Sequence, residues 1–152
     1  YTTWRDYKMA KGALLEKNSG AGGLLSNVEH ITAAKTIVEA DSGKVFMLSS
    51  ADGAYDITLP TAATGQNGAV YKFVVHEETP SFDITIKAGS AIISLVMKDA
   101  GGDAANSTAG TQVSNVIVEA ASQRGDFVEL MFWNGEYYAH AMSAINDGIT
   151  TS

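Results

Sequence analysis

Aromatic side chains cluster around an Asn-Gly dipeptide and could stack on a sugar ring. Trp133 precedes Asn134-Gly135, and Tyr137 and Tyr138 follow it. Aromatic rings offer large apolar faces to a ligand, but aromatic residues beside a hairpin turn also pack on one another across the two strands. We favour packing over sugar binding. Trp133, Tyr137 and Tyr138 therefore form a possible subunit-contact or ligand surface.

Histidines and carboxylates are the other candidates for chemistry. Residues 76–78, His-Glu-Glu, suggest an acid–base or metal pair, but they follow a strand and precede a proline, so we expect a solvated loop. His140 alternates with alanines and is predicted to be a core or interface residue. Asp99 and Asp103 could offer oxygens to calcium, but the glutamate that closes a calcium-binding loop is missing. We expect no bound metal and no cofactor.

No motif of a known catalytic type is present in the sequence. There is no nucleophile elbow, P-loop, dinucleotide fingerprint or His-Glu-x-x-His pair. The absence of cysteine excludes a disulfide framework, a cysteine zinc site and a cysteine nucleophile. Paired carboxylates of a glycosidase stay open, because such groups meet only in the folded chain. The expectation is that the protein is not an enzyme.

Composition limits the partners of the chain. Its 152 residues, 45% of them apolar, suit one domain with a sizeable core. The net charge of −7 is unfavourable for nucleic acid, because binding to phosphates needs an excess of Lys and Arg. No apolar run approaches the roughly 20 residues that span a bilayer. We expect neither nucleic acid nor a membrane as a partner.

The first 18 residues differ from the rest and are expected to form an interaction arm. Trp4 and Tyr7 are interleaved with the basic residues Arg5, Lys8 and Lys11. A Ser-Gly-Ala-Gly-Gly linker at residues 19–23 then provides flexibility. The alternative is that the aromatic residues pack on the body of the protein. We assign residues 1–34 to this N-terminal arm and its Gly-rich linker.

Short apolar or alternating segments follow the linker and predict an all-β domain, a β-sandwich or jelly-roll-like barrel of about nine strands with an extended N-terminal arm. Asn134-Gly135 predicts a two-residue type I′ hairpin turn, which needs positive φ at both positions. We assign the β-domain to residues 35–145 and expect a loose tail at 146–152. The predicted strands are residues 35–40, 44–49, 55–59, 70–76, 82–88, 91–97, 115–120, 126–133 and 136–142.

Two patterns in these strands carry further expectations. Residues 45–48 and 116–118 are apolar on both faces, and such strands need cover on both faces. A second copy of the chain, or else the protein's own loops, would cover the outer face. Residues 55–59 and 82–86 share an aromatic-Asp-Ile-Thr-aliphatic pattern, which predicts two strands in similar environments.

Several of these segments resemble one known family. The chain resembles tailed-phage virion β-domains, which occur as trimeric capsid decoration (cement) proteins and as trimeric domains of tail fibres and spikes. The resemblance covers roughly residues 35–142, and its motifs are short and mostly structural. The segments that carry it are residues 40–48, 55–60, 71–75, 125–130 and 133–138.

The resemblance implies a structural virion protein without catalytic residues. It implies a homotrimer on the outer capsid surface, assembled in the host cytoplasm and stabilising the shell, with the major capsid protein as partner. No fibre shaft is expected before residue 35, which favours decoration over a fibre, and the arm would contact the major capsid protein or a neighbouring copy. The alternative is a receptor-binding, glycan-binding domain of a tail fibre or spike, using Trp133, Tyr137 or the long polar loop at 98–110. The expected capsid-contact residues are Trp4, Arg5, Tyr7, Lys8 and Lys11.

Overall fold

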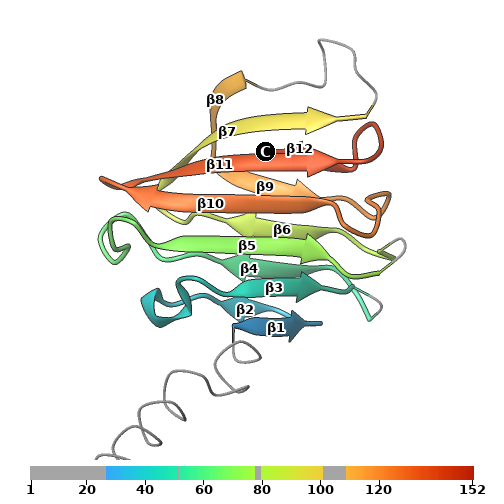
Figure 1. The fold of residues 1–152 in the computed structure, drawn as a ribbon, viewed down its shortest axis with the longest axis horizontal. Coiled ribbons are helices and arrows are strands. Elements are labelled where there is room, and N and C mark those ends of the chain that lie inside the picture. The colour runs from blue at the N-terminus through green and yellow to red at the C-terminus, as the bar shows by residue number, and fades with distance from the viewer. Residues whose placement is uncertain (1–26, 51, 78–79, 101–108) are drawn as a thin grey trace, which may run out of the picture.

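Two β-sheets pack face to face in the computed structural model, which describes residues 27–50, 52–77, 80–100 and 109–152 (Figure 1). One sheet has seven strands and the other has five. The larger sheet runs, in spatial order, β1 (Val28–Ile31), β3 (Val45–Leu48), β5 (Val70–Val75), β10 (Phe127–Trp133), β11 (Glu136–Ser143), β7 (Ile92–Asp99) and β8 (Ala109–Val113). The smaller runs β12 (Ile149–Thr151), β9 (Asn115–Val118), β6 (Ile84–Lys87), β4 (Tyr55–Thr58) and β2 (Lys35–Thr36).

The all-β prediction is confirmed, and the arrangement is that of a sandwich. Both sheets are open, with parallel and antiparallel neighbours mixed in each. All nine predicted strands occur. The segment at residues 35–40 is strand only at β2, and the short 3-10 helix η1 (Glu39–Asp41) follows it.

The chain winds between the two sheets along its first seven strands. From β1 to β7 each successive strand lies in the sheet opposite to the one before it. As a result β1, β3 and β5 are parallel neighbours in one sheet, while β2, β4 and β6 are parallel neighbours in the other. Parallel strands need a long crossover, and here the opposite sheet provides it in place of a helix.

The repeated aromatic-Asp-Ile-Thr pattern follows from this winding. The two segments that carry it become β4 and β6, which lie side by side and parallel. Ile57 pairs with Ile86, and both side chains are fully buried. The prediction of two strands in similar environments is confirmed.

The core lies between the two sheets. It is built from the alternate residues of each strand that point inward. Phe46 of β3 stacks on Phe73 of β5 with ring centroids 5.1 Å apart. Phe132 meets Tyr137 edge to face at 5.0 Å across the last hairpin. Strand alternation sends such residues inward and their sequence neighbours outward.

The last hairpin has the predicted turn. Asn134 has φ of 50° and Gly135 has φ of 86°, so both positions are left-handed, as a type I′ turn requires. Trp133 pairs with Glu136 directly across the two-residue loop. The backbone N–H of Asn134 also donates to the side-chain oxygen of Asn67 at 2.7 Å, which ties the turn to a neighbouring loop.

Three strands were not predicted, and they change the domain boundaries. The loose tail expected at 146–152 is wrong, because Ile149 is fully buried and β12 pairs with β9. The arm assigned to residues 1–34 is too long, because β1 already belongs to the larger sheet. The third is β8, which ends the long predicted loop at 98–110. Each of these strands lies at the edge of a sheet, and the residues of the arm up to 26 lie outside the described part of the chain.

Candidate functional site

The outward face of the seven-stranded sheet is the most distinctive surface of the molecule. Along β11, Tyr137, Ala139 and Ala141 are buried, while Tyr138, His140 and Met142 point outward and are exposed. The same alternation runs through β10, β5 and β7. We call the outward side of these four strands the apolar face.

Cross-strand pairing arranges the apolar face in rows. The Met131 row consists of Val70, Met131, Tyr138 and Ser94. The Glu129 row consists of Lys72, Glu129, His140 and Val96. The Phe127 row consists of Val74, Phe127, Met142 and Lys98. The ion-paired residues Lys72 and Glu129 therefore lie in the middle row, between rows that are mostly apolar.

Large apolar side chains are concentrated on this side of the sandwich. Trp133 is 53% exposed, Tyr138 46% and Met131 44%. Of the ten exposed large hydrophobic residues in the described part of the chain, eight point outward from the seven-stranded sheet. They are Val28, Val70, Ile92, Val96, Met131, Trp133, Tyr138 and Met142. Contiguous apolar patches of this kind are rare on monomers and commonly mark interaction sites.

The outward face of the smaller sheet is polar by contrast. Thr58 and Thr85 point outward from β4 and β6, beside the ion pair between Lys87 and Asp56 at 2.6 Å. Threonine suits an exposed strand, because it combines β-branching with a hydroxyl that water can hydrate. The apolar character therefore belongs to one sheet and is not general to the protein.

The Glu129 row supplies the electrostatics of the apolar face. Lys72 Nζ lies 3.3 Å from Glu129 Oε2 and 4.7 Å from the centre of the Phe127 ring. Phe127 in turn meets the His140 ring edge to face at 5.8 Å. Exposed ion pairs contribute little stability, so this row chiefly fixes where charge lies within an apolar surface.

The predicted aromatic surface is partly wrong. Trp133 and Tyr138 are exposed on the apolar face, but Tyr137 is fully buried. Its hydroxyl donates to the carbonyl oxygen of Pro60 at 2.6 Å, and burial raises its pKa. Strand alternation places adjacent residues on opposite faces, so Tyr137 and Tyr138 cannot share one surface. The arm residues Trp4, Arg5, Tyr7, Lys8 and Lys11 lie outside the described residues.

The other candidate residues do not converge on a catalytic or metal site. His140 is exposed, so the core alternative for it is wrong and the interface alternative remains. Asp99 is buried, and among the residues that the structure describes neither of its carboxylate oxygens has a hydrogen-bond partner, while Asp103 lies outside that part of the chain. Within the described ranges no three His, Asp or Glu side chains are grouped to hold a metal ion.

Sequence reasoning missed Met131, Met142 and Phe127 as members of the surface. The available signal was a strand that is apolar on both faces, because Leu130 and Phe132 point inward while Met131 points outward. The same signal was noted at residues 45–48, where Met47 is outward and pairs with Val74. Applied to residues 127–133, it would have identified the apolar face.

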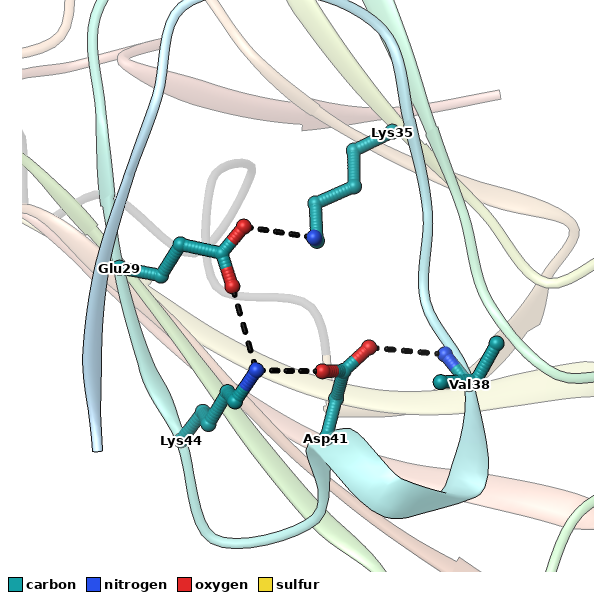
Figure 2. Close-up of polar contacts among 5 residues, drawn as sticks. All are labelled: Glu29, Lys35, Val38, Asp41 and Lys44. Carbon is teal, nitrogen blue, oxygen red and sulfur yellow. Dashed lines mark hydrogen bonds and ion pairs between the residues drawn. The ribbon is translucent and has the colours of Figure 1, made fainter. Parts of the chain in front are cut away.

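An ion cluster fastens the first strand of the body (Figure 2). Glu29 of β1 accepts hydrogen bonds from Lys35 at 2.6 Å and from Lys44 at 3.3 Å. Lys44 also donates to Asp41 at 2.7 Å, and Asp41 accepts the backbone N–H of Val38 at 3.0 Å. The cluster joins β1 to η1 and to the start of β3.

The cluster shifts the ionisation of its members. The hydrogen bond from Lys35 is the main reason that the pKa of Glu29 is lowered. Burial alone would raise the pKa of Asp41, but hydrogen bonds from Lys44 and the Val38 N–H lower it on balance. The pKa of Lys44 is raised, chiefly by its hydrogen bond to Asp41. Each shift favours the charged form, so the cluster stabilises the folded state at neutral pH.

A shallow groove at the end of the sandwich offers little for chemistry. It has a volume of about 510 Å³ and lies between the segment after β2 and the segment after β4. Its lining includes Val38, Leu59 and Pro60, and the one ionisable side chain among its lining residues is Glu39. A single carboxylate with no second ionisable side chain in the lining gives little basis for general acid–base catalysis.

In the described residues, no helix has the length and apolar character needed to cross a membrane. Comparison with protein-family models, curated proteins and solved structures gave no match to the chain. The apolar face, its charges and the attachment of β1 to the larger sheet are therefore the basis for the function proposed below.

Proposed function

We propose that this protein is a structural component of a tailed-phage virion. It acts as a capsid decoration (cement) protein that trimerises on the outer capsid surface and stabilises the shell. The observation that carries the proposal is the apolar face, an exposed surface suited to contact between proteins. The resemblance of the strand motifs to tailed-phage virion β-domains is the reason that we place this contact between proteins in a virion.

The apolar face suits assembly better than catalysis or ligand capture. It is broad and follows a regular sheet, whereas small-molecule sites are concave and enclose most of the ligand. Its Met and aromatic residues are types enriched at protein interfaces. Burial of apolar surface contributes about 25 cal/mol per Å², so many copies with modest contacts add up to a large stabilisation of a shell.

The arm supplies the second contact, to the major capsid protein. It combines aromatic residues with the basic residues Arg5, Lys8 and Lys11, while the whole chain carries a net charge of −7. Aromatic and arginine residues are common anchors at interfaces. A segment that becomes ordered on binding loses part of this gain to conformational entropy.

The attachment of β1 suits an arm that bears load. The backbone N–H of Val45 donates to the carbonyl of Asn27 at 2.7 Å, at the point where the arm enters the body. β1 then pairs with β3, and the Glu29 ion cluster holds the same strand. A pull on the arm is therefore shared between strand hydrogen bonds and ion pairs.

A capsid-binding assay tests the role of the arm. Full-length protein, a variant lacking residues 1–18, and Lys8→Glu/Lys11→Glu are each sedimented with purified capsids that lack the protein. We expect at least a tenfold loss of affinity for both variants, about 1.4 kcal/mol or more. Lys87→Glu, on the polar face, is the matched control and keeps full binding. Unchanged binding by the truncated protein would contradict the arm as the capsid contact.

The second candidate function is receptor binding at the tip of a fibre or spike. The observation in its favour is that Trp133 and Tyr138 are both exposed and point to the same side of the sheet. A glycan array discriminates between the two functions. Specific binding that is lost in Trp133→Ala, with folding retained, would favour the receptor-binding role.

A further inference from the structure

We propose that further copies of this chain cover the apolar face, around a rotation axis that runs parallel to β10 and β11. Each row of one copy then meets the same row of the next. The inference names the surface that makes the oligomer of the proposed function, and it rests on that oligomer but not on the capsid as its location. Three observations support a copy of the same chain as the occupant.

The first observation is the charge of the apolar face. Lys72 and Lys98 balance Glu129 and Glu136 on its outward side, so the face is neutral. The chain as a whole carries a net charge of −7, so the entire excess lies elsewhere. Copies of an acidic protein repel one another over most of their surfaces. A neutral apolar face is the surface on which they approach with least repulsion.

The second observation is that the rows are complementary to themselves. Rotation about an axis parallel to the strands keeps the height of every row and brings β11 of one copy toward β10 of the next. Glu129 then faces His140 of the next copy, Met131 faces Tyr138, and Phe127 faces Met142. These are one acid–imidazole contact and two sulfur–aromatic contacts, and both kinds are favourable.

The other way of stacking two such faces lacks this match. A two-fold axis across the strands at the height of the Glu129 row would place β10 over β10, with Glu129 against Glu129. Like charges facing each other within an apolar interface cost several kcal/mol. The row pattern therefore favours an axis parallel to the strands, whether two or three copies surround it.

The third observation is the size of the face. The four strands of the apolar face, about 4.8 Å apart and each with about seven residues rising about 3.4 Å, span on the order of 450 Å² of flat sheet. Side chains increase the accessible area above the flat value. Stable interfaces bury about 800 Å² on each partner, so the face makes one only when its full width is covered.

Measurement of mass in solution tests the surface. Light scattering and sedimentation at micromolar concentration should give wild-type protein a mass of two or three times 15.9 kDa. Met131→Glu and Tyr138→Glu should weaken assembly at least tenfold and shift the protein toward the monomer. Thr58→Glu and Thr85→Glu are the matched controls on the polar face and should leave assembly unchanged. Circular dichroism confirms that each variant is folded.

A mixing experiment tests the register of the rows. Chains with His140→Glu alone bring two carboxylates together between copies, and chains with Glu129→Lys alone lose the acid–imidazole contact, so both should assemble poorly. A mixture of the two chains restores opposite charges across the contact and should assemble at least tenfold better than either chain alone. Because the two substitutions are on separate chains, the rescue cannot come from the pairing of Glu129 with His140 within one chain.

The outcomes separate this inference from the proposed function. A monomeric wild-type protein, or assembly unchanged in Met131→Glu and Tyr138→Glu, would overturn the inference even if the protein binds capsids. Dispersal of the oligomer by deletion of residues 1–18 alone would overturn it in favour of the arm as the occupant. A wild-type oligomer that disperses with the face variants but never binds capsids would support the inference and contradict the capsid role.

Discussion

Tyr137 and Tyr138 are adjacent in β11 and perform different tasks. Tyr137 is fully buried, packs edge to face on Phe132, and donates its hydroxyl to the Pro60 carbonyl at 2.6 Å. Tyr138 is exposed on the apolar face. Without the Tyr137 hydroxyl, the Pro60 carbonyl would be buried without a hydrogen-bond donor, which is unfavourable because it has also lost its contact with water. Tyr137 therefore has a stabilising role that Tyr138 does not share.

Removal of the Tyr137 hydroxyl should lower the free energy of unfolding. We expect Tyr137→Phe to cost about 1–2 kcal/mol, because it leaves the Pro60 carbonyl without its buried donor. Urea unfolding followed by fluorescence measures the loss. Tyr138→Phe, compared at the same protein concentration, is the control and should change stability by less than about 0.5 kcal/mol. Equal losses of unfolding free energy in the two variants would show that the hydrogen bond to Pro60 adds no measurable stability.

Residue-level prediction succeeded where local chemistry decides the conformation. The Asn134-Gly135 turn was predictable because few other residue pairs adopt positive φ at two successive positions. The burial of Tyr137 was not recognised, although strand alternation around it gives the answer once its partner Phe132 is placed inward. The hydrogen bond to Pro60 joins residues 77 positions apart in the sequence, and no local sequence pattern predicts a contact at that separation.

At the scale of elements, the Glu29 ion cluster holds β1, a short edge strand of the larger sheet. β1 has four residues and, among the strands of the described ranges, one neighbour, β3. Such a strand has few hydrogen bonds of its own. Asp41 is the best-protected member of the cluster, with only 9% of its side chain exposed, and it bonds both Lys44 and the Val38 backbone. Asp41 is therefore the residue on which the cluster depends most.

Asp41→Asn should destabilise the protein and alter its response to acid. The lowered pKa values of Glu29 and Asp41 mean that their contribution is fully present above the ordinary carboxylate values of 4.5 and 3.8 and is lost as pH falls through the lower folded values. We expect Asp41→Asn to cost about 1–2 kcal/mol at pH 7 and to flatten the loss of stability below about pH 4. Thermal or urea unfolding between neutral pH and pH 2 measures both effects.

A matched control for Asp41→Asn lies on the polar face. Asp56 pairs with Lys87 at 2.6 Å, but half of its side chain is exposed. Exposed ion pairs contribute about 0–1 kcal/mol, so Asp56→Asn should have a much smaller effect. A similar loss for both substitutions, or an unchanged acid response in Asp41→Asn, would contradict the role given to the cluster.

Strand prediction succeeded in the middle of the sheets and failed at their edges. The strands β3, β5, β10 and β11 are recognisable in the sequence by their aromatic and β-branched residues. Each of them lies between two neighbouring strands of the larger sheet. β1, β8 and β12 were missed, and β2 is shorter than predicted. These four are the edge strands of the two sheets, and pairing with a single neighbour distant in sequence defines them more than their own composition does.

For the whole molecule, the two outward faces differ in kind. The polar face carries threonines and an exposed ion pair, while the apolar face carries methionines and aromatic residues around the ion pair of Lys72 and Glu129. The two-sided strands in the sequence indicated that an outer face needs cover. The winding of the chain between sheets was not predictable, because parallel pairing of β1, β3 and β5 depends on long-range contacts.

The central claim is that many copies of this protein coat the outside of a capsid, and their number in a purified virion tests it most directly. Quantitative mass spectrometry against the major capsid protein gives the copy number, and protease treatment of intact particles reports the exposed location. We predict tens to hundreds of copies per particle, accessible from outside. A few copies per particle, confined to the tail, would contradict the claim and indicate a fibre or spike component instead.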